Sequence, residues 1–205
     1  MTLRIAGRAP VLACLGLVLW ACASAPIQEM SDARQALEAA RHTQAELLAP
    51  VEIEQAERHL MRAEQALEVR DYRRAHREAE RAKTHAVAAR SLAAELNAAR
   101  DAVAEAEQAG IPSAEAAALL AQAEQAAKVG LQEQALSLAN QAQASLEQPL
   151  QQLYLGKARD LLDRHEGAPS MTGLQREQLQ RAREAYDRGD GRAALQLLQG
   201  LTSQP

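Results

Sequence analysis

The stretch AEQALEVRDYRRA, at residues 63–75, recurs twice further along the chain. It returns as AEQAAKVGLQEQA at 123–135 and, more faintly, as AREAYDRGDGRAA at 182–194, so the copies lie 60 and then 59 residues apart. Self-similarity at a fixed period is typical of proteins built from repeated supersecondary units. We therefore expect one repeat domain at 31–205. Its three units of about 60 residues should span 31–89, 90–148 and 149–205.

The composition predicts that every unit is helical. Alanine, leucine, glutamine, glutamate and arginine dominate the chain, aromatic residues make up 2%, and phenylalanine is absent. The abundant residues have the highest helix propensity, and this bias is typical of long helices and coiled coils. The expected fold is all-α. Proline, glycine and capping residues place seven helices at about 31–48, 51–69, 71–108, 113–129, 131–164, 174–188 and 191–200.

Alanines at heptad spacing run along the third of these helices. Seven apolar positions follow one another at steps of four and three residues, which places them on one face. These seam positions are Ala75, Ala79, Ala82, Ala86, Ala89, Ala93 and Leu96. A stripe in the helix before each repeated turn carries Leu60, Leu120 and Leu179 at matching positions. We expect each of these leucines to point into its own bundle.

The turn inside each copy has a position suited to glycine, followed by a capping residue. Gly130 and Gly189 stand where helices commonly end in a left-handed residue, and Arg70 occupies the same place in the first copy. Asp71 and Asp190 then offer a side-chain oxygen to cap the next helix. We expect Arg70 to adopt a strained or looser turn. The alternative is a continuous helix through Arg70.

Two of the expected helices are about twice as long as their neighbours. Residues 71–108 would extend roughly 57 Å, which is too long to pack along one short partner. The simplest arrangement is a set of antiparallel hairpins, or short three-helix bundles, in which each long helix closes one bundle and opens the next. Pro149 would kink the second long helix at such a joint. We expect an extended rod, because 86–93 contains no glycine or proline where a fold-back would have to bend.

The first 21 residues have the character of an export signal. Arg4 and Arg8 precede an almost wholly apolar run at 9–21 that contains no acidic residue. A charged segment followed by a short apolar one is typical of a secretory signal peptide. The apolar run is also short of the roughly 20 residues that a transmembrane helix needs. We therefore expect residues 1–21 to be a signal peptide.

The four residues LWAC at 19–22 resemble the lipobox of bacterial lipoproteins, although a tryptophan replaces the usual small residue. The resemblance implies that the chain is cut before Cys22, that its thiol receives a diacylglycerol, and that its new amine is acylated. Cys22 is thus the expected lipidation site, with 22–30 as a lipidated tether. Two or more acyl chains hold a protein firmly to a bilayer. The alternative is an ordinary signal peptide that is cut at Ala21 or Ala23.

The residue after the cysteine bears on the choice of membrane. In Gram-negative lipoproteins an aspartate at that position is associated with retention in the inner membrane, whereas this chain has Ala23. The expected location is therefore the outer membrane, with the helical domain facing the periplasm.

A second resemblance covers residues 49–95, with their AP break and the segments RAEQAL and RDYRRA. This region resembles an uncharacterised bacterial domain of unknown function, which occurs in helical lipoproteins rich in alanine and glutamate and ahead of OmpA-like peptidoglycan-binding domains. The resemblance implies a cell-envelope location and brings no known active site. The C-terminal half has no OmpA-like α/β pattern, so a direct hold on peptidoglycan by such a module is not expected.

The titratable residues form no recognisable catalytic or metal-binding pattern. His76 and Glu80 are four residues apart, which suits a surface pair. Most carboxylates, such as Glu78, have a basic neighbour three or four positions away, which is typical of a solvated helix face. Neither a nucleophile elbow nor a phosphate-binding glycine loop is present. We expect no enzyme activity, cofactor or metal. The five histidines are dispersed at His42, His59, His76, His85 and His165.

Charge and seam composition narrow the class of function. Removal of residues 1–21 takes away Arg4 and Arg8, so 21 basic residues remain against 27 acidic ones, a net charge of −6. This sign does not favour nucleic acid. We expect a helical scaffold or adaptor that binds another cell-envelope protein, and the seams are compatible with a homo-oligomer. The alternative is a lipid-associated module whose amphipathic helices bind membrane or carry lipid, although alanine faces give little insertion energy.

Replacement of Cys22 by serine tests the anchor. Because serine cannot form the thioether, the variant should leave membrane fractions or accumulate as unprocessed precursor, and it should not be labelled by a fatty-acid analogue. Fractionation and metabolic labelling of intact cells measure both effects. A variant with Cys14 replaced by serine is the matched control and should remain labelled. Continued acylation of Cys22→Ser would contradict the assignment.

Overall fold

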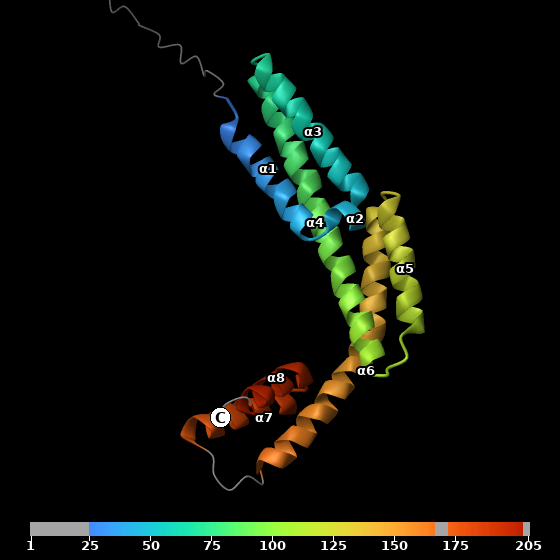
Figure 1. Cartoon of the computed structure of the whole chain (residues 1–205), viewed down its shortest axis with the longest axis vertical. Helices are drawn as coiled ribbons and strands as arrows, with labels where there is room; N and C mark the ends of the chain where they lie inside the picture. The colour runs from blue at the N-terminus through green and yellow to red at the C-terminus, as the bar shows by residue number, and fades with distance from the viewer. Residues whose placement is uncertain (1–24, 167–171, 203–205) are drawn as a thin grey trace, which may run out of the picture.

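The computed structural model describes residues 25–166 and 172–202, and the regular elements in these ranges are all α-helices (Figure 1). The expected all-α fold is confirmed. Among these residues, no helix combines the length and apolar character needed to cross a membrane. In chain order the helices are α1 (Ile27–His42), α2 (Ala45–Leu48), α3 (Pro50–Glu68), α4 (Tyr72–Gln108), α5 (Ala114–Lys128), α6 (Gln132–Glu166), α7 (Gly173–Asp187) and α8 (Gly191–Thr202).

The two long helices each take part in two groups of packed helices. The first half of α4 lies against α1 and α3, and its second half lies against α5 and α6 (Figure 1). The first half of α6 packs against α4 and α5, and its second half packs against α7 and α8. Successive groups are therefore joined through a shared helix, and α1 to α3 lie well away from α7 and α8 (Figure 1).

Alanine dominates the helix contacts. All seven seam positions of α4, from Ala75 to Leu96, are at most 2% exposed, as the heptad spacing predicts. Two main core clusters organise the fold: one runs from Leu37 on α1 to Leu150 in the middle of α6, and the other, around Leu198, is enclosed by α7, α8 and the end of α6. A smaller cluster around Met30 joins α1, α3 and the first turns of α4. Leu120 is buried, whereas Leu60 and Leu179 are half-buried at the edges of their clusters. All three leucines pack against a core cluster of their own part of the fold, as expected, and Leu120 is the most deeply buried of them.

The three repeated turns have the same backbone geometry. Arg70, Gly130 and Gly189 have φ values of 58°, 79° and 80°, so each adopts the left-handed conformation. In each turn the next residue donates its backbone N–H to a carbonyl five residues earlier, at 2.9 Å, which is the Schellman pattern of a helix end. The Asp71 carboxylate then accepts a hydrogen bond from the backbone N–H of Arg74, at 3.0 Å. A turn at Arg70 is confirmed, and the continuous helix is excluded.

The start of the fold differs from the expected boundaries. Helix α1 begins at Ile27, so the last four residues of the segment expected to be a tether are helical. The single helix expected at 31–48 is interrupted, because Gln44 takes a left-handed φ of 60°. The Thr43 hydroxyl donates a hydrogen bond to the Ala40 carbonyl, and the Thr43 backbone carbonyl accepts one from the Asn97 amide. These bonds satisfy backbone carbonyls that the break leaves without a helical partner. The change of direction buries Leu48.

Pro149 lies inside α6, which remains helical on both sides of it. A proline cannot donate the backbone hydrogen bond that the carbonyl four residues earlier would accept, and its ring crowds that carbonyl. Figure 1 shows α6 changing direction between the part that packs on α5 and the part that packs on α7 and α8. Between the helices expected at 131–164 and 174–188, residues 167–171 lie outside the described residues.

Replacement of Arg70 by glycine tests the strain at the first turn. Glycine adopts the left-handed conformation without the steric cost that other residues incur, about 1–2 kcal/mol. The variant should therefore gain about 1 kcal/mol in free energy of unfolding, measured by chemical denaturation. Arg90→Gly, at an exposed position inside α4, is the matched control and should lose about 1 kcal/mol. Equal losses from both variants would contradict this account.

Candidate functional site

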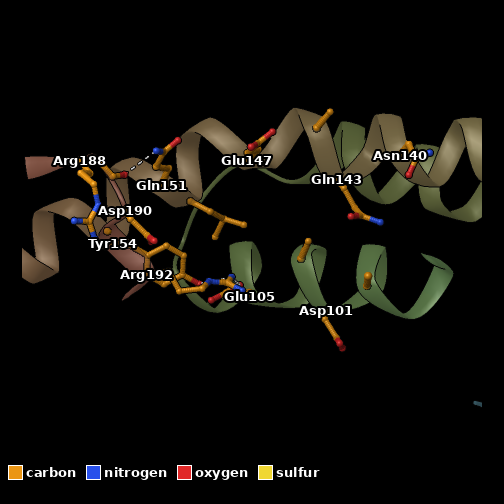
Figure 2. A pocket seen from close by; sticks show the side chains of 16 residues that line it. Asp101, Glu105, Asn140, Gln143, Glu147, Gln151, Tyr154, Arg188, Asp190 and Arg192 are labelled. Carbon is orange, nitrogen blue, oxygen red and sulfur yellow. Dashed lines mark hydrogen bonds and ion pairs between the residues drawn. The ribbon is translucent and has the colours of Figure 1, made fainter. Parts of the chain in front are cut away.

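An open groove of about 860 Å³ lies where α4, α6 and the α7–α8 turn meet (Figure 2). It falls between the two core clusters, at the place where α6 leaves the first cluster and enters the second. Its floor includes Leu150 and several alanines, and its walls and rim are polar. The lining consists of Ala98, Asp101, Ala102, Glu105, Asn140, Gln143, Ala144, Glu147, Leu150, Gln151, Tyr154, Arg188, Gly189, Asp190, Gly191 and Arg192.

The α7–α8 turn is held against α6 by a close backbone approach. A Cβ atom on Gly191 would lie 2.6 Å from the backbone nitrogen of Leu155, so a larger residue would push the turn away. The Gln151 amide donates a hydrogen bond of 2.9 Å to the Gly189 carbonyl (Figure 2). The Asp190 carboxylate caps α8 by accepting from the backbone N–H of Ala193, at 3.0 Å. These contacts fix one end of the groove.

Arg192 ties the third group of helices to the second. Its guanidinium forms an ion pair of 2.7 Å with Glu105 on α4 and donates a hydrogen bond of 2.8 Å to the Tyr154 hydroxyl on α6. The same guanidinium lies 4.9 Å from the centre of the Tyr154 ring, a cation–π distance. Figure 2 shows the three side chains converging at one end of the groove.

The remaining groove walls present acids and amides. Asp101 on α4 and Glu147 on α6 line the two sides of the groove, and Figure 2 shows their carboxylates pointing away from each other. Both residues are exposed, and neither forms an ion pair among the described residues. Gln143 reaches from α6 to donate to the Glu95 carbonyl of α4, at 3.2 Å. The lining has four carboxylates and two arginines. An excess of carboxylates beside amides and a phenol suits a polar ligand that carries positive charge.

Two stacked histidine–carboxylate pairs lie between α3 and α4, away from the groove. The rings of His59 and His85 are 5.4 Å apart and nearly parallel. Each ring places Nδ1 2.7 Å from a carboxylate oxygen, His59 on Glu78 and His85 on Glu52. Because an ionised carboxylate only accepts hydrogen bonds, each Nδ1 is the donor. These pairs join α3 to α4 through polar contacts within an alanine-rich interface.

The expectation that Glu78 lies on a solvated face is wrong. Its residue surface is 8% exposed, and besides His59 it contacts Arg81 at 3.3 Å. The hydrogen bond from His59 holds the pKa of the Glu78 carboxyl below its usual value, and burial opposes this effect by raising the pKa. The positive charge of Arg81 also lowers the pKa. The signal that identifies this residue is its place on α4, beside the buried seam residues Ala75 and Ala79.

The residues singled out from the sequence are not brought together. Cys22, the expected lipidation site, lies outside the described residues. His76 forms an ion pair with Glu29 at 3.3 Å, rather than with Glu80 on its own helix. Within 25–166 and 172–202, no group of three or more histidines, cysteines or acids is arranged to hold a metal ion. Of the groove residues, the sequence singled out Gly189 and Asp190 as turn and capping residues. The others were not singled out, because their proximity depends on how α4 and α6 cross.

Comparison with known families bears on the first group of helices. Residues 28–95 match the domain of unknown function DUF4398. The match covers α1 to α3 and most of α4, which supports an uncharacterised helical domain in this part of the chain. No curated protein and no solved structure matches the chain.

Replacement of Glu78 by glutamine tests the polar contact between α3 and α4. At neutral pH the variant should lose about 1–3 kcal/mol of unfolding free energy, because the largely buried pair loses its charge-assisted hydrogen bond. Since folding lowers the carboxyl pKa, Glu78 stabilises the wild type above the unfolded value, about 4.5, and this contribution disappears as pH falls through the folded value.

Denaturation at a series of pH values measures this difference. The difference in unfolding free energy between wild type and Glu78→Gln should become smaller below a pH of about 4.5. Glu54→Gln is the matched control on α3, because its carboxylate makes an exposed ion pair of 3.6 Å with Arg58, and it should change stability by less than about 0.5 kcal/mol. A Glu78 gap that stays constant through the acid range would contradict the assignment.

Proposed function

We propose that the chain is an outer-membrane lipoprotein whose helical domain faces the periplasm and serves as a scaffold for another cell-envelope protein. The lipobox-like segment that ends at Cys22 supports acylation. The resemblance of the first group of helices to domains found in helical lipoproteins supports an envelope location. The anchor holds the chain at the bilayer, and the helices project a binding surface away from it.

The helical domain is, in this proposal, three copies of one unit of about 60 residues. The shared left-handed geometry of Arg70, Gly130 and Gly189 supports this reading, as do the aspartate caps that follow the first and third of these residues. Each copy adds a hairpin to a long helix supplied by its neighbour. In an array of this kind each added unit lengthens the domain, and the places where neighbouring units meet form surfaces that a partner can bind.

The observation that carries the scaffold role is the open groove between the two core clusters. Asp101 and Glu147 stand on its two walls without ion-pair partners among the described residues. Alanines at its base leave room for the larger side chains of a partner. The occupant that fits is a segment rich in lysine and arginine from another envelope protein, because its charges would pair with both walls.

The lipid-associated alternative requires the helices to open. The faces that would be released are lined mainly by alanine. Because hydrophobic transfer scales with the apolar area removed from water, alanine faces gain little from insertion into a bilayer. The closed scaffold is therefore the function that the side chains support better.

A photo-crosslinking residue in place of Asn140, which is exposed on the lining, tests the groove in intact cells. The full chain should form a discrete adduct with one envelope protein, and mass spectrometry should place the crosslink in a basic segment. Charge reversal of both walls, Asp101→Lys with Glu147→Lys, should reduce the adduct at least tenfold, because two favourable pairs become repulsive.

The matched control reverses two exposed charges on the same helices outside the groove, Glu107→Lys on α4 with Asp160→Lys on α6. This control should keep the adduct, and circular dichroism should show that both double variants remain folded. An adduct that is insensitive to reversal of Asp101 and Glu147, or equally sensitive in the control, would refute the groove as the docking site.

A further inference from the structure

The turn between α3 and α4 carries a cluster of arginines that we call the basic tip. Its members, Arg70, Arg73, Arg74 and Arg77, are all exposed, and none forms an ion pair with a carboxylate among the described residues. The acids in the same segment are Glu68 and Asp71, so residues 68–77 keep an excess of positive charge in a chain whose net charge is −4.

Most cations elsewhere in the first two groups of helices have acidic partners. Arg41 contacts three carboxylates, Lys83 contacts Asp32 at 2.8 Å, and Arg100 contacts Glu124 at 2.6 Å. The same neutralisation occurs for Arg34, Arg58 and Arg81. The concentration of unpaired arginines at one end of a helix pair is thus a local departure from the pattern of the fold, and it points to an anionic partner outside the chain.

Two large apolar side chains are exposed at the same end. Ile27, the first residue of α1, is 76% exposed, and Val69, beside Arg70, is 74% exposed. A cavity of about 450 Å³ connects the start of α1 to the start of α4, because Ala25 and Pro26 line it together with Arg73 and Arg77. Glu29 also lines this cavity, and its carboxylate lies 3.3 Å from His76. Arginines beside protruding apolar side chains suit the interface of a bilayer, where charges meet headgroups and apolar groups enter the acyl boundary.

The position of the chain entry places this end near the anchor. Ala25 follows Cys22 by three residues, and three residues span at most about 10 Å. If Cys22 is acylated, as proposed above, Arg73 and Arg77 come within reach of the headgroups that surround the acyl chains. This distance is about one Debye length at physiological ionic strength, so attraction between the arginines and anionic lipid is weakened by salt but still acts.

We propose that the basic tip docks on the anionic phospholipid headgroups of the membrane that holds the anchor, while the helices stay closed. The inference rests on the proposed acylation for its location but not for its chemistry. Glu105 lies 33 residues beyond Tyr72 on α4, roughly 50 Å along the helix. Docking at the tip therefore directs α4 outward and holds the groove far from the bilayer.

Vesicle binding by the chain without its acyl groups tests this docking surface. The protein is the mature chain from position 22 with Cys22→Ser, which retains every described residue. Co-sedimentation is measured with vesicles of phosphatidylcholine alone and with vesicles in which one third of the lipid is phosphatidylglycerol. Binding should require phosphatidylglycerol, fall as salt rises, and leave the helical circular dichroism unchanged. Inorganic phosphate at matched ionic strength should compete no better than chloride.

The variant Arg73→Gln with Arg77→Gln should weaken binding to the anionic vesicles about 25-fold, since each arginine near such a surface contributes about fivefold. The matched control, Arg90→Gln with Arg159→Gln, removes the same charge from exposed positions away from the tip and should bind within twofold of the parent. Thermal melts establish that both variants fold.

Three outcomes would overturn the proposal. They are no binding to phosphatidylglycerol vesicles at low salt, equal weakening in the control variant, and a gain of helix on binding, which would indicate opened helices instead of a docked tip. Capture by an acidic protein without vesicle binding belongs to the first outcome. Because the protein carries no acyl chain, these results are separate from the fate of Cys22 and from crosslinking at the groove.

Discussion

Close packing of helices on alanine is the constraint on which the rest of this structure depends. Small side chains let helix backbones approach one another, but each buries little apolar area, so a single hairpin gains limited free energy from folding. The chain meets this limit by sharing its long helices. Helix α4 contributes one half of its seam to α1 and α3 and the other half to α5 and α6, and the first core cluster continues across that joint without a break.

The groove also results from the small apolar area that alanine-lined helices bury. Helix α6 must leave α4 and α5 to reach α7 and α8, and Pro149 lies on the stretch where it does so. The two core clusters therefore remain separate, and polar contacts bridge the space between them. Arg192 links Glu105 and Tyr154, while Gly191 permits the approach of α8 to α6. The position of the groove walls thus depends on the contacts that hold the third group of helices.

Local signals in the sequence were sufficient for the helices and for most of their ends. Arg70 could be identified as a turn because glycine occupies the aligned positions 130 and 189, and the seam of α4 followed from its spacing. The break at Gln44 could not be predicted in this way, because no glycine or proline lies at that point in the sequence. The sequence places Glu78 on a solvated face, because basic residues stand three or four positions away on the same helix. Its hydrogen-bond partner His59 lies on α3, and spacing within one helix cannot indicate that contact. The groove depends on the angle between α4 and α6, which residue spacing does not specify.

Helix α4 separates two surfaces of opposite charge. The basic tip lies at its first turns, and the carboxylates Asp101 and Glu105 lie near its last turns. No glycine or proline interrupts the helix between them, and its seam is buried along the whole distance from Ala75 to Ala106. A helix supported along its length in this way transmits orientation, because its two ends cannot turn independently. If the tip docks on anionic headgroups as proposed, the stiffness of α4 alone holds the acidic groove roughly 50 Å away, because the field of the headgroups is screened within about 10 Å and acts only on the tip.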